Sequence, residues 1–296
     1  MTPRITIITP SYNQANYIEA TILSVLNQNY PNLEYIIIDG SSTDNSVDII
    51  RRYEDRLAYW CSEPDAGQSD AINKGLRRAT GDIIGYLNSD DKLTPDALNI
   101  VGLMMQHTPQ SWMSGAVRIV NAQGSVVRLW EPTYPPVPLT AVMMPWGVPQ
   151  PACFWRRELF DRFGLFRQDM HYAFDTQFQL QLLLAGEKPL LTSFVLAEAL
   201  LHESSKTGAS LGKGHFWQEI RLFQKEFVPQ LAPRESALGK AVLWLTDQGS
   251  TQPSDQKPPS LPEWMRAVAY APRLVTTSGL AALARLTGLQ KWKPHH

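Results

Sequence analysis

A chain of 296 residues with 27 basic and 28 acidic side chains can bury a sizeable core and has almost no net charge. This balance excludes a protein whose overall charge draws it to nucleic acid. No apolar run reaches the roughly 18 residues of a membrane-spanning helix, and an early first strand leads us to expect no secretory signal. Cys61 and Cys153 lack metal-ligand spacing, so we expect buried thiols in a reducing, cytoplasmic compartment.

Apolar strands alternate with amphipathic helices from residue 4 to about residue 107. We expect strands at "RITIIT", "LEYIIID", "LAYWCSE" and "DIIGYLN", each followed by residues with helical periodicity. Ser42 or Thr43 is the expected N-cap of the second helix. Continuous apolar strands between helices predict a largely parallel sheet covered on both faces.

Polar and acidic residues follow all of these strands. Ligands of such sheets bind beyond the carboxyl ends of the strands, so we expect a site there. The segment after the fourth expected strand carries two adjacent carboxylates, Asp90 and Asp91. Their repulsion is unfavourable unless a positive group lies against them. Three alternatives stay open for what lies against the two carboxylates: a metal ion, a basic side chain, or water at a loop tip. The segments are Thr9–Tyr12, Asp39–Asp44, Glu63–Gly67 and Asn88–Asp91.

The pattern changes after about residue 110. "SWMSGAVRIVNAQGSVVRLW" predicts two antiparallel strands joined by a turn at 122–124. Helices that stop at Gly164 and Gly186 follow, and "LLTSFVLAEALLHE" predicts a strand or two. We expect this α+β material to pack on the sheet of the first half. A stretch rich in Ser, Pro, Gln and Thr, 249–262, predicts a linker.

The first half resembles a known family. "TIITPSYNQANYIEATILSVLNQNYPNLEYIIIDGSSTDNS" and "EPDAGQSDAINKGLRRATGDIIGYLNSDD" are similar to family-2 glycosyltransferases over roughly residues 4–100, and more loosely to about residue 207. The resemblance implies the GT-A fold, a Rossmann-like, mostly parallel α/β sheet flanked by helices. It implies a glycosyltransferase domain over 1–232, with a nucleotide-sugar-binding half (1–107) and an acceptor-side half (108–232), before a linker and helical C-terminal extension over 233–296.

A nucleoside diphosphate that leaves a sugar gains negative charge, which a divalent cation held by carboxylates can neutralise. The resemblance makes Asp90 the expected ligand of Mn²⁺ or Mg²⁺, with Asp91 as a second ligand or as a partner of the ligands. It also implies that His202 completes the metal shell or contacts the diphosphate. Family members often carry Asp-x-Asp here, whereas this chain has an amide at Asn88 in place of the first carboxylate. The alternatives are solvated acids in a capped loop and a structural histidine.

The resemblance also implies a nucleotide site. Tyr12 would stack on the base, and Asp39 would accept a hydrogen bond from a base N–H, which favours uracil or a similar pyrimidine. A turn started by Asp39 and a surface ion pair between Asp70 and Lys74 are the structural alternatives. The expected donor-site residues are Pro10, Tyr12, Asp39, Asp65, Asp70, Lys74, Asn88, Ser89 and Lys206.

The acceptor alcohol needs a base, because it is a poor nucleophile until its proton leaves. Asp175 in "YAFDTQFQLQL" matches the family's Glu-Asp motif at a helix start, with Phe174 in place of the first acid, and is the expected base. Alternatively, Asp175 caps that helix. Gln150 is expected on the acceptor side.

These residues favour an inverting, metal-dependent glycosyltransferase of the hexosyltransferase type. It would move one sugar from a nucleotide-diphosphate-sugar to a hydroxyl of a glycan or lipid-linked acceptor in polysaccharide biosynthesis. The expected donor is a UDP-sugar, because Asp39 would favour uracil as the base. The replacements at Asn88 and Phe174 favour instead a non-catalytic nucleotide-sugar-binding subunit. A sugar-phosphate nucleotidyltransferase is disfavoured because the loop after the first strand lacks a Gly-rich, basic sequence.

Leucines recur every three residues in "SGLAALARLTGLQKW", residues 278–292, among basic and aromatic residues. Such a helix can lie in a membrane interface, which predicts peripheral contact with the inner face of the membrane and access to a lipid-linked acceptor. Alternatively, the leucine face packs on the catalytic domain or on a second subunit of a homo-oligomer.

Overall fold

The computed structural model describes residues 2–133, 142, 147–202, 205, 215–233, 235–236, 239–240 and 243. Lys206 and the helix expected over 278–292 lie outside the described residues, so membrane contact and cytoplasmic location stay predictions of the sequence. The chain divides into two compact units, Met1–Pro135 with Pro145–Glu219, and Pro136–Met144 with Ile220–His296. No helix within the described ranges is long and apolar enough to cross a membrane.

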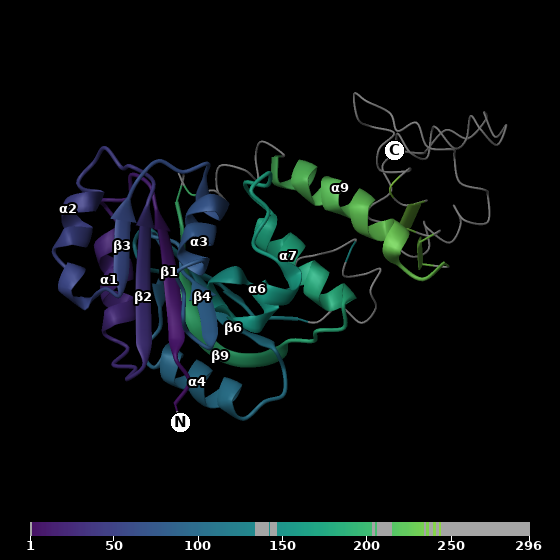
Figure 1. Cartoon of the computed structure of the whole chain (residues 1–296), viewed down its shortest axis with the longest axis horizontal. Coiled ribbons are helices and arrows are strands. Elements are labelled where there is room, and N and C mark those ends of the chain that lie inside the picture. The colour runs from purple at the N-terminus through teal and green to yellow at the C-terminus, as the bar shows by residue number, and fades with distance from the viewer. Residues whose placement is uncertain are drawn as a thin grey trace. The chain divides into compact units, whose positions relative to one another are not determined.

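A nine-stranded sheet forms the centre of the first unit, in the order β3-β2-β1-β4-β8-β6-β9-β5, with β7 paired to β6 (Figure 1). The strands of the first half run parallel, as the pairs β1–β2, β1–β4 and β2–β3. β8 pairs antiparallel with both β4 and β6. The bounds are β1 Ile5–Ser11, β2 Leu33–Asp39, β3 Tyr59–Ser62, β4 Ile83–Tyr86, β5 Lys92–Leu93, β6 Trp112–Asn121, β7 Val126–Trp130, β8 Cys153–Arg156 and β9 Leu190–Leu201.

Helices cover both faces of the parallel strands. Ile5 and Ile7 of β1 belong to the core cluster that contains buried residues of α1, α2 and α4. Ile8 points to the opposite face because side chains alternate along a strand, and it contacts α3. A Cβ on Gly75 of α3 would lie 2.5 Å from Ile8 Cγ2, so glycine permits this close approach. The helices are α1 Ile18–Leu26, α2 Ser46–Arg51, α3 Gln68–Leu76, α4 Ala97–Gln106, α6 Glu158–Phe163, α7 Phe174–Leu184 and α9 His215–Phe227.

Most predicted elements are confirmed. The two strands around residues 122–124 form the antiparallel pair β6–β7. α6 and α7 are followed by Gly164 and Gly186 with positive φ of 85° and 87°, a backbone that glycine adopts without steric cost. The predicted N-cap of the second helix was wrong: α2 starts at Ser46 after Asn45.

The second half of the chain extends the sheet of the first half, whereas we expected it to pack on that sheet. β8 inserts between β4 and β6 and continues the sheet into an antiparallel region. Its sequence "CFWR" gave no strand signal, because four residues in the sheet interior carry no alternation of apolar and polar positions. Of the two thiols, Cys153 is buried and Cys61 only partly so.

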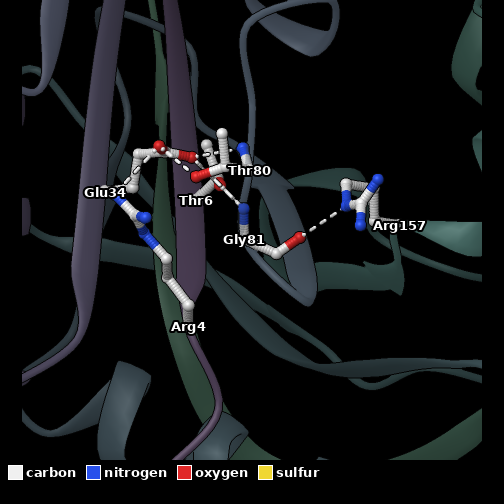
Figure 2. A network of polar contacts seen from close by, with 6 residues as sticks. All are labelled: Arg4, Thr6, Glu34, Thr80, Gly81 and Arg157. Atoms are coloured by element: carbon white, nitrogen blue, oxygen red, sulfur yellow. Dashed lines mark hydrogen bonds and ion pairs between the residues drawn. The ribbon is translucent and has the colours of Figure 1, made fainter.

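A buried carboxylate joins the amino-terminal ends of β1 and β2, and Figure 2 shows its network. Glu34 accepts hydrogen bonds from Thr6 Oγ1 at 2.5 Å and from Thr80 N and Oγ1, both at 2.7 Å. Arg4 lies 3.1 Å from the same carboxylate. Burial by itself would raise the pKa of Glu34, but these hydrogen bonds and the charge of Arg4 outweigh it and lower the pKa.

Glu34→Gln is expected to lower the free energy of unfolding at pH 7 by about 2–3 kcal/mol, because the amide leaves buried donors without an acceptor. A lowered pKa means that the carboxylate stabilises the fold above its unfolded-state pKa of about 4.3. This contribution is lost as the pH falls through the lower folded-state pKa. Chemical denaturation from pH 7 to pH 3 should therefore show the wild type and the variant converging below about pH 4.

The matched control is Glu54→Gln, at an exposed glutamate. Its unfolding free energy should follow the wild type at every pH. A constant gap between wild type and Glu34→Gln across the pH range would show that the charge of Glu34 does not stabilise the fold.

Candidate active site

The register of the parallel strands brings polar residues to one edge of the sheet. Ser11 at the end of β1 pairs with Asp39 at the end of β2, and Asp39 pairs with Ser62 at the end of β3. Asp39 is fully buried. Its carboxylate accepts hydrogen bonds from Ser42 N at 2.9 Å, Ser42 Oγ at 2.5 Å and Ser62 Oγ at 2.7 Å. The turn expected as the structural alternative for Asp39 is therefore present. Ser42 donates two hydrogen bonds to Asp39 in this turn and does not cap α2.

Two buried polar atoms beside this turn have no hydrogen-bond partner among the described residues. They are Ser11 Oγ and Gln14 Oε1, which lie at and just beyond the carboxyl end of β1. Buried polar groups are almost always paired in folded proteins. Tyr12 lies between them in sequence and is 61% exposed. This edge of the sheet thus offers unsatisfied polar groups beside an exposed aromatic ring, as a ligand site requires.

The loop after β3 folds back onto the end of β2. A Cβ on Gly40 would lie 2.5 Å from Asp65 Oδ2, so glycine at this position leaves room for the Asp65 carboxylate. Asp65 Oδ1 accepts a hydrogen bond from Gly67 N at 2.8 Å. Gly67 has a positive φ of 118° and lies against His171, which brings the loop before α7 to the same place.

Asp70 and Lys74 on α3 brace this loop. Lys74 Nζ donates to Pro64 O at 2.7 Å and lies 3.0 Å from Glu63 Oε1, whereas Asp70 Oδ2 is 3.8 Å away. Asp70 Oδ2 also accepts from Ala66 N at 3.1 Å. These contacts support the structural alternative for both residues, and a role of either in donor binding stays a prediction.

The adjacent carboxylates of Asp90 and Asp91 have different partners. Asp90 Oδ2 lies 3.0 Å from His202 Nε2, although 112 residues separate the two in sequence. The His202 ring packs 4.8 Å from the ring of Tyr17, which precedes α1. Asp91 is buried, and its carboxylate accepts hydrogen bonds from Leu200 N and Asn88 Nδ2, both at 3.1 Å. Asp90 is thus the carboxylate that pairs with histidine, whereas Asp91 fastens β9 to the loop after β4.

Burial raises the pKa of Asp91 well above its ordinary value, and the charge of Asp90 raises it further. Asn88 connects Asp91 to α3. Its Nδ2 donates to the Asp91 carboxylate, and its Oδ1 accepts a hydrogen bond from Gln68 Nε2 of α3 at 2.5 Å. The amide that replaces the expected carboxylate therefore holds α3 and the loop after β4 together. Pro10 and Ser89, two other expected donor residues, lie buried in β1 and beside Asp90 respectively.

Asp90 and His202 fit a divalent cation as a partial ligand set. The described residues contain no group of three or more His, Cys, Asp or Glu side chains that could hold a metal ion. Mg²⁺ is usually bound through one or two carboxylates together with substrate phosphates and water, and Mn²⁺ also prefers carboxylate oxygen. The pair would therefore supply two ligands, and a diphosphate and water would supply the others.

Asp175 is the second residue of α7, and Ala173 occupies the N-cap position that we considered for it. Its Oδ1 accepts a hydrogen bond from Thr176 N at 2.7 Å. Burial raises the pKa of Tyr86 well above its ordinary value, and the charges of Asp175 and Asp91 and a hydrogen bond with Asp175 raise it further. Tyr86 therefore links Asp175 to the carboxyl end of β4.

Tyr86 is absent from the expected site residues. Its strand position in "DIIGYLN" marked it only as a core residue. Its ring packs against Phe166, Phe174 and Trp155 at 5.6–6.2 Å between centroids. Gln150, expected on the acceptor side, donates from Nε2 to Tyr86 O at 2.8 Å and so supports the end of β4.

The family model described as Glycosyl transferase family 2 matches residues 6–162, more than half of the chain, and the chain belongs to that family. It is an enzyme of the glycosyltransferase class. An uncharacterized glycosyltransferase of Mycobacterium tuberculosis is 31% identical over 211 residues, 66% of this chain and 74% of that protein. The putative teichuronic acid biosynthesis glycosyltransferase TuaG of Bacillus subtilis is 44% identical over 99 residues, 32% of this chain and 39% of that protein.

Solved structures confirm the GT-A fold. TarS of S. aureus, in complex with UDP-GlcNAc, has a TM-score of 0.64 at 19% identity and covers 94% of this chain and 83% of that chain. The mannosyltransferase PcManGT from Pyrobaculum calidifontis, in complex with GDP-Man and Mn²⁺, has a TM-score of 0.59 at 23% identity and covers 99% of this chain and 82% of that chain.

Proposed function

We propose that the protein is an inverting, metal-dependent hexosyltransferase that moves one sugar from a UDP-sugar to a hydroxyl of a glycan or lipid-linked acceptor. The observation that carries the proposal is the pairing of Asp90 with His202 at the carboxyl edge of the sheet, where Tyr86 links Asp175 to the same strand end. The likeness of the chain to TuaG, a putative teichuronic acid biosynthesis enzyme, supports a role in polysaccharide biosynthesis.

The donor would bind at the ends of β1 and β2. Ser11 Oγ and Gln14 Oε1 are buried and unpaired among the described residues, so hydroxyls or N–H groups of a nucleoside could satisfy them. The exposed ring of Tyr12 offers a stacking surface for a base. Asp39 uses three acceptor positions within the protein, and a carboxylate has about four, which leaves capacity for a base N–H.

The proposed reaction needs one proton transfer and one displacement. The acceptor oxygen attacks the anomeric carbon from the side opposite to the nucleoside diphosphate, and its proton passes to the Asp175 carboxylate. The bond from the anomeric carbon to the diphosphate breaks, so the anomeric configuration is inverted. A bound divalent cation would neutralise the charge on the leaving diphosphate, and Asp90 and His202 would hold it.

Hydrolysis of a panel of nucleotide sugars, with and without Mn²⁺, tests this function. We expect slow hydrolysis of one or more UDP-sugars with Mn²⁺, and at least about a hundredfold less after chelation, because a metal ion contributes several kcal/mol to such charge stabilisation. Hydrolysis that EDTA leaves unchanged would contradict the metal dependence. UDP binding without turnover of any sugar would indicate a non-catalytic binding subunit, and pyrophosphate-dependent cleavage would indicate a nucleotidyltransferase.

A further inference from the structure

The loop between α6 and α7 ends at Ala173, directly before the first residue of α7, and a buried carboxylate binds the last three residues of that loop. Glu219 of α9 accepts hydrogen bonds from His171 N at 2.7 Å through Oε1 and from Tyr172 N and Ala173 N, both at 2.8 Å, through Oε2. Its exposed fraction is 9%. Three consecutive backbone N–H groups that converge on one anion fix the orientation of three peptide planes. Those planes lead into the first turn of α7.

The position of this carboxylate also suits the helix that follows. The first N–H groups of a helix lack acceptors within the helix, and a negative charge near them is favourable. Hydrogen bonds from backbone N–H groups to a carboxylate are roughly twice as strong as those between neutral groups. Glu219 therefore holds the start of α7, where Asp175 is the second residue, more firmly than water would.

The other part of the same loop is held by α3. Asn73 Nδ2 donates to Phe166 O at 2.7 Å, and Phe166 N donates to Asn73 Oδ1 at 3.0 Å. Gln168 Nε2 donates to Asp70 Oδ1 at 2.6 Å. Ser69 Oγ of α3 also donates to Met170 O at 3.4 Å, and the three bonds to Glu219 hold the residues that follow, 171–173.

A contact between two aromatic rings also joins the first turn of α9 to the loop. The ring of Tyr172 stacks on His215, one helical turn before Glu219, with centroids 5.9 Å apart and planes 14° apart. Glu219 is the last residue of the first compact unit, so all of these contacts lie within that unit. It also lies beyond residues 6–162, over which the family model matches.

We propose that Glu219 is a positioning residue for Asp175. The inference rests on the proposed function, in which Asp175 takes the proton of the acceptor. Misplacement of a catalytic group by about 1 Å can cost about a hundredfold in rate, and Glu219 fixes the three peptides that precede the turn bearing Asp175. Glu219 would thus contribute to catalysis through Asp175 without itself taking part in the proton transfer.

The first test compares Glu219→Gln with Glu226→Gln, at an exposed glutamate of the same helix. Glutamine keeps the size of the side chain but turns an NH₂ group toward backbone N–H groups. We expect Glu219→Gln to lower kcat for donor hydrolysis about ten- to a hundredfold. KM for the donor and the affinity for UDP should stay at wild-type values, and Glu226→Gln should keep wild-type kcat. Loss of donor affinity and kcat together would overturn the proposal in favour of a general structural role.

The second test is a double-mutant cycle with Asp175→Asn. If Glu219 acts through Asp175, Glu219→Gln should lower kcat no further once the base is absent. Equal losses in both backgrounds would overturn the positioning role. If Asp175→Asn is slow while Glu219→Gln is as fast as the wild type, this inference fails and the proposed function stands; wild-type kcat in Asp175→Asn contradicts the proposed function itself.

Thermal unfolding must accompany both tests, because Glu219 is buried. If Glu219→Gln does not fold, the cycle is repeated with Glu219→Asp, which keeps the charge and shortens the side chain by one methylene. The same non-additive loss is expected there. An additive loss in that variant would overturn the proposal.

Discussion

Asp90→Asn is expected to lower sugar transfer by about a thousandfold or more and to weaken the Mn²⁺-dependent binding of the nucleoside diphosphate. The asparagine keeps the shape of the side chain but loses the charge that faces His202 across 3.0 Å. A thousandfold loss corresponds to about 4 kcal/mol, within the several kcal/mol that a metal ion contributes to transition-state charge stabilisation. Steady-state kinetics and titration of UDP with and without Mn²⁺ measure the two effects.

Asp96→Asn is the matched control, because it makes the same change at an exposed residue. Asp96 has a positive φ of 63°, which asparagine also tolerates. The control should keep wild-type turnover. Unchanged turnover in Asp90→Asn would contradict the metal assignment and pass the role to Asp91.

Asp175→Asn is expected to lower kcat at least about a hundredfold while donor binding stays nearly intact, since a positioned general base contributes roughly 10²–10⁴-fold. The amide cannot take the proton of the acceptor. Pre-steady-state turnover at saturating donor, together with UDP titration, separates the two quantities.

Asp161→Asn on α6 serves as the control for this experiment, because the Asp161 side chain is 71% exposed. It should match the wild type in both measurements. An Asp175→Asn enzyme that binds the donor poorly but turns over normally at saturation would show that Asp175 is not the base.

The sequence predicted the parallel half of the fold because each strand there is a continuous apolar run that ends in polar residues. Ile5–Ser11 and Leu33–Asp39 are strands for that reason. β8 was missed because a short strand in the sheet interior has no alternating pattern. The joining of both halves in one sheet was also missed, since pairing between β4 and β8 depends on contacts distant in sequence.

Residue types and the family resemblance together suggested Asp90, His202 and Asp175 as site residues. They could not assign different roles to adjacent side chains of the same type. Asp90 and Asp91 are neighbours of the same type, and only the fold turns Asp91 toward Leu200 N and leaves Asp90 to His202. Lys74 looked equally suited to a phosphate or to an ion pair, and its contacts with Glu63 and Pro64 support the latter.

Glu219 gave no signal in the sequence. In "HFWQEIRLF" it looks like one more charged residue of an amphipathic helix, a class that is usually solvated. Its function depends on three N–H groups more than 45 residues earlier in the chain. Only a structure that places α9 against the loop before α7 could reveal it.

The most direct test of the proposed chemistry is an anomalous-scattering map at the manganese edge, from crystals grown with UDP and Mn²⁺. The account predicts one strong peak within coordination distance of Asp90 Oδ and His202 Nε2 and of the diphosphate, with the base beside Tyr12 and Asp39. A peak elsewhere on the chain, or UDP bound at the strand ends with no manganese beside Asp90, would contradict it.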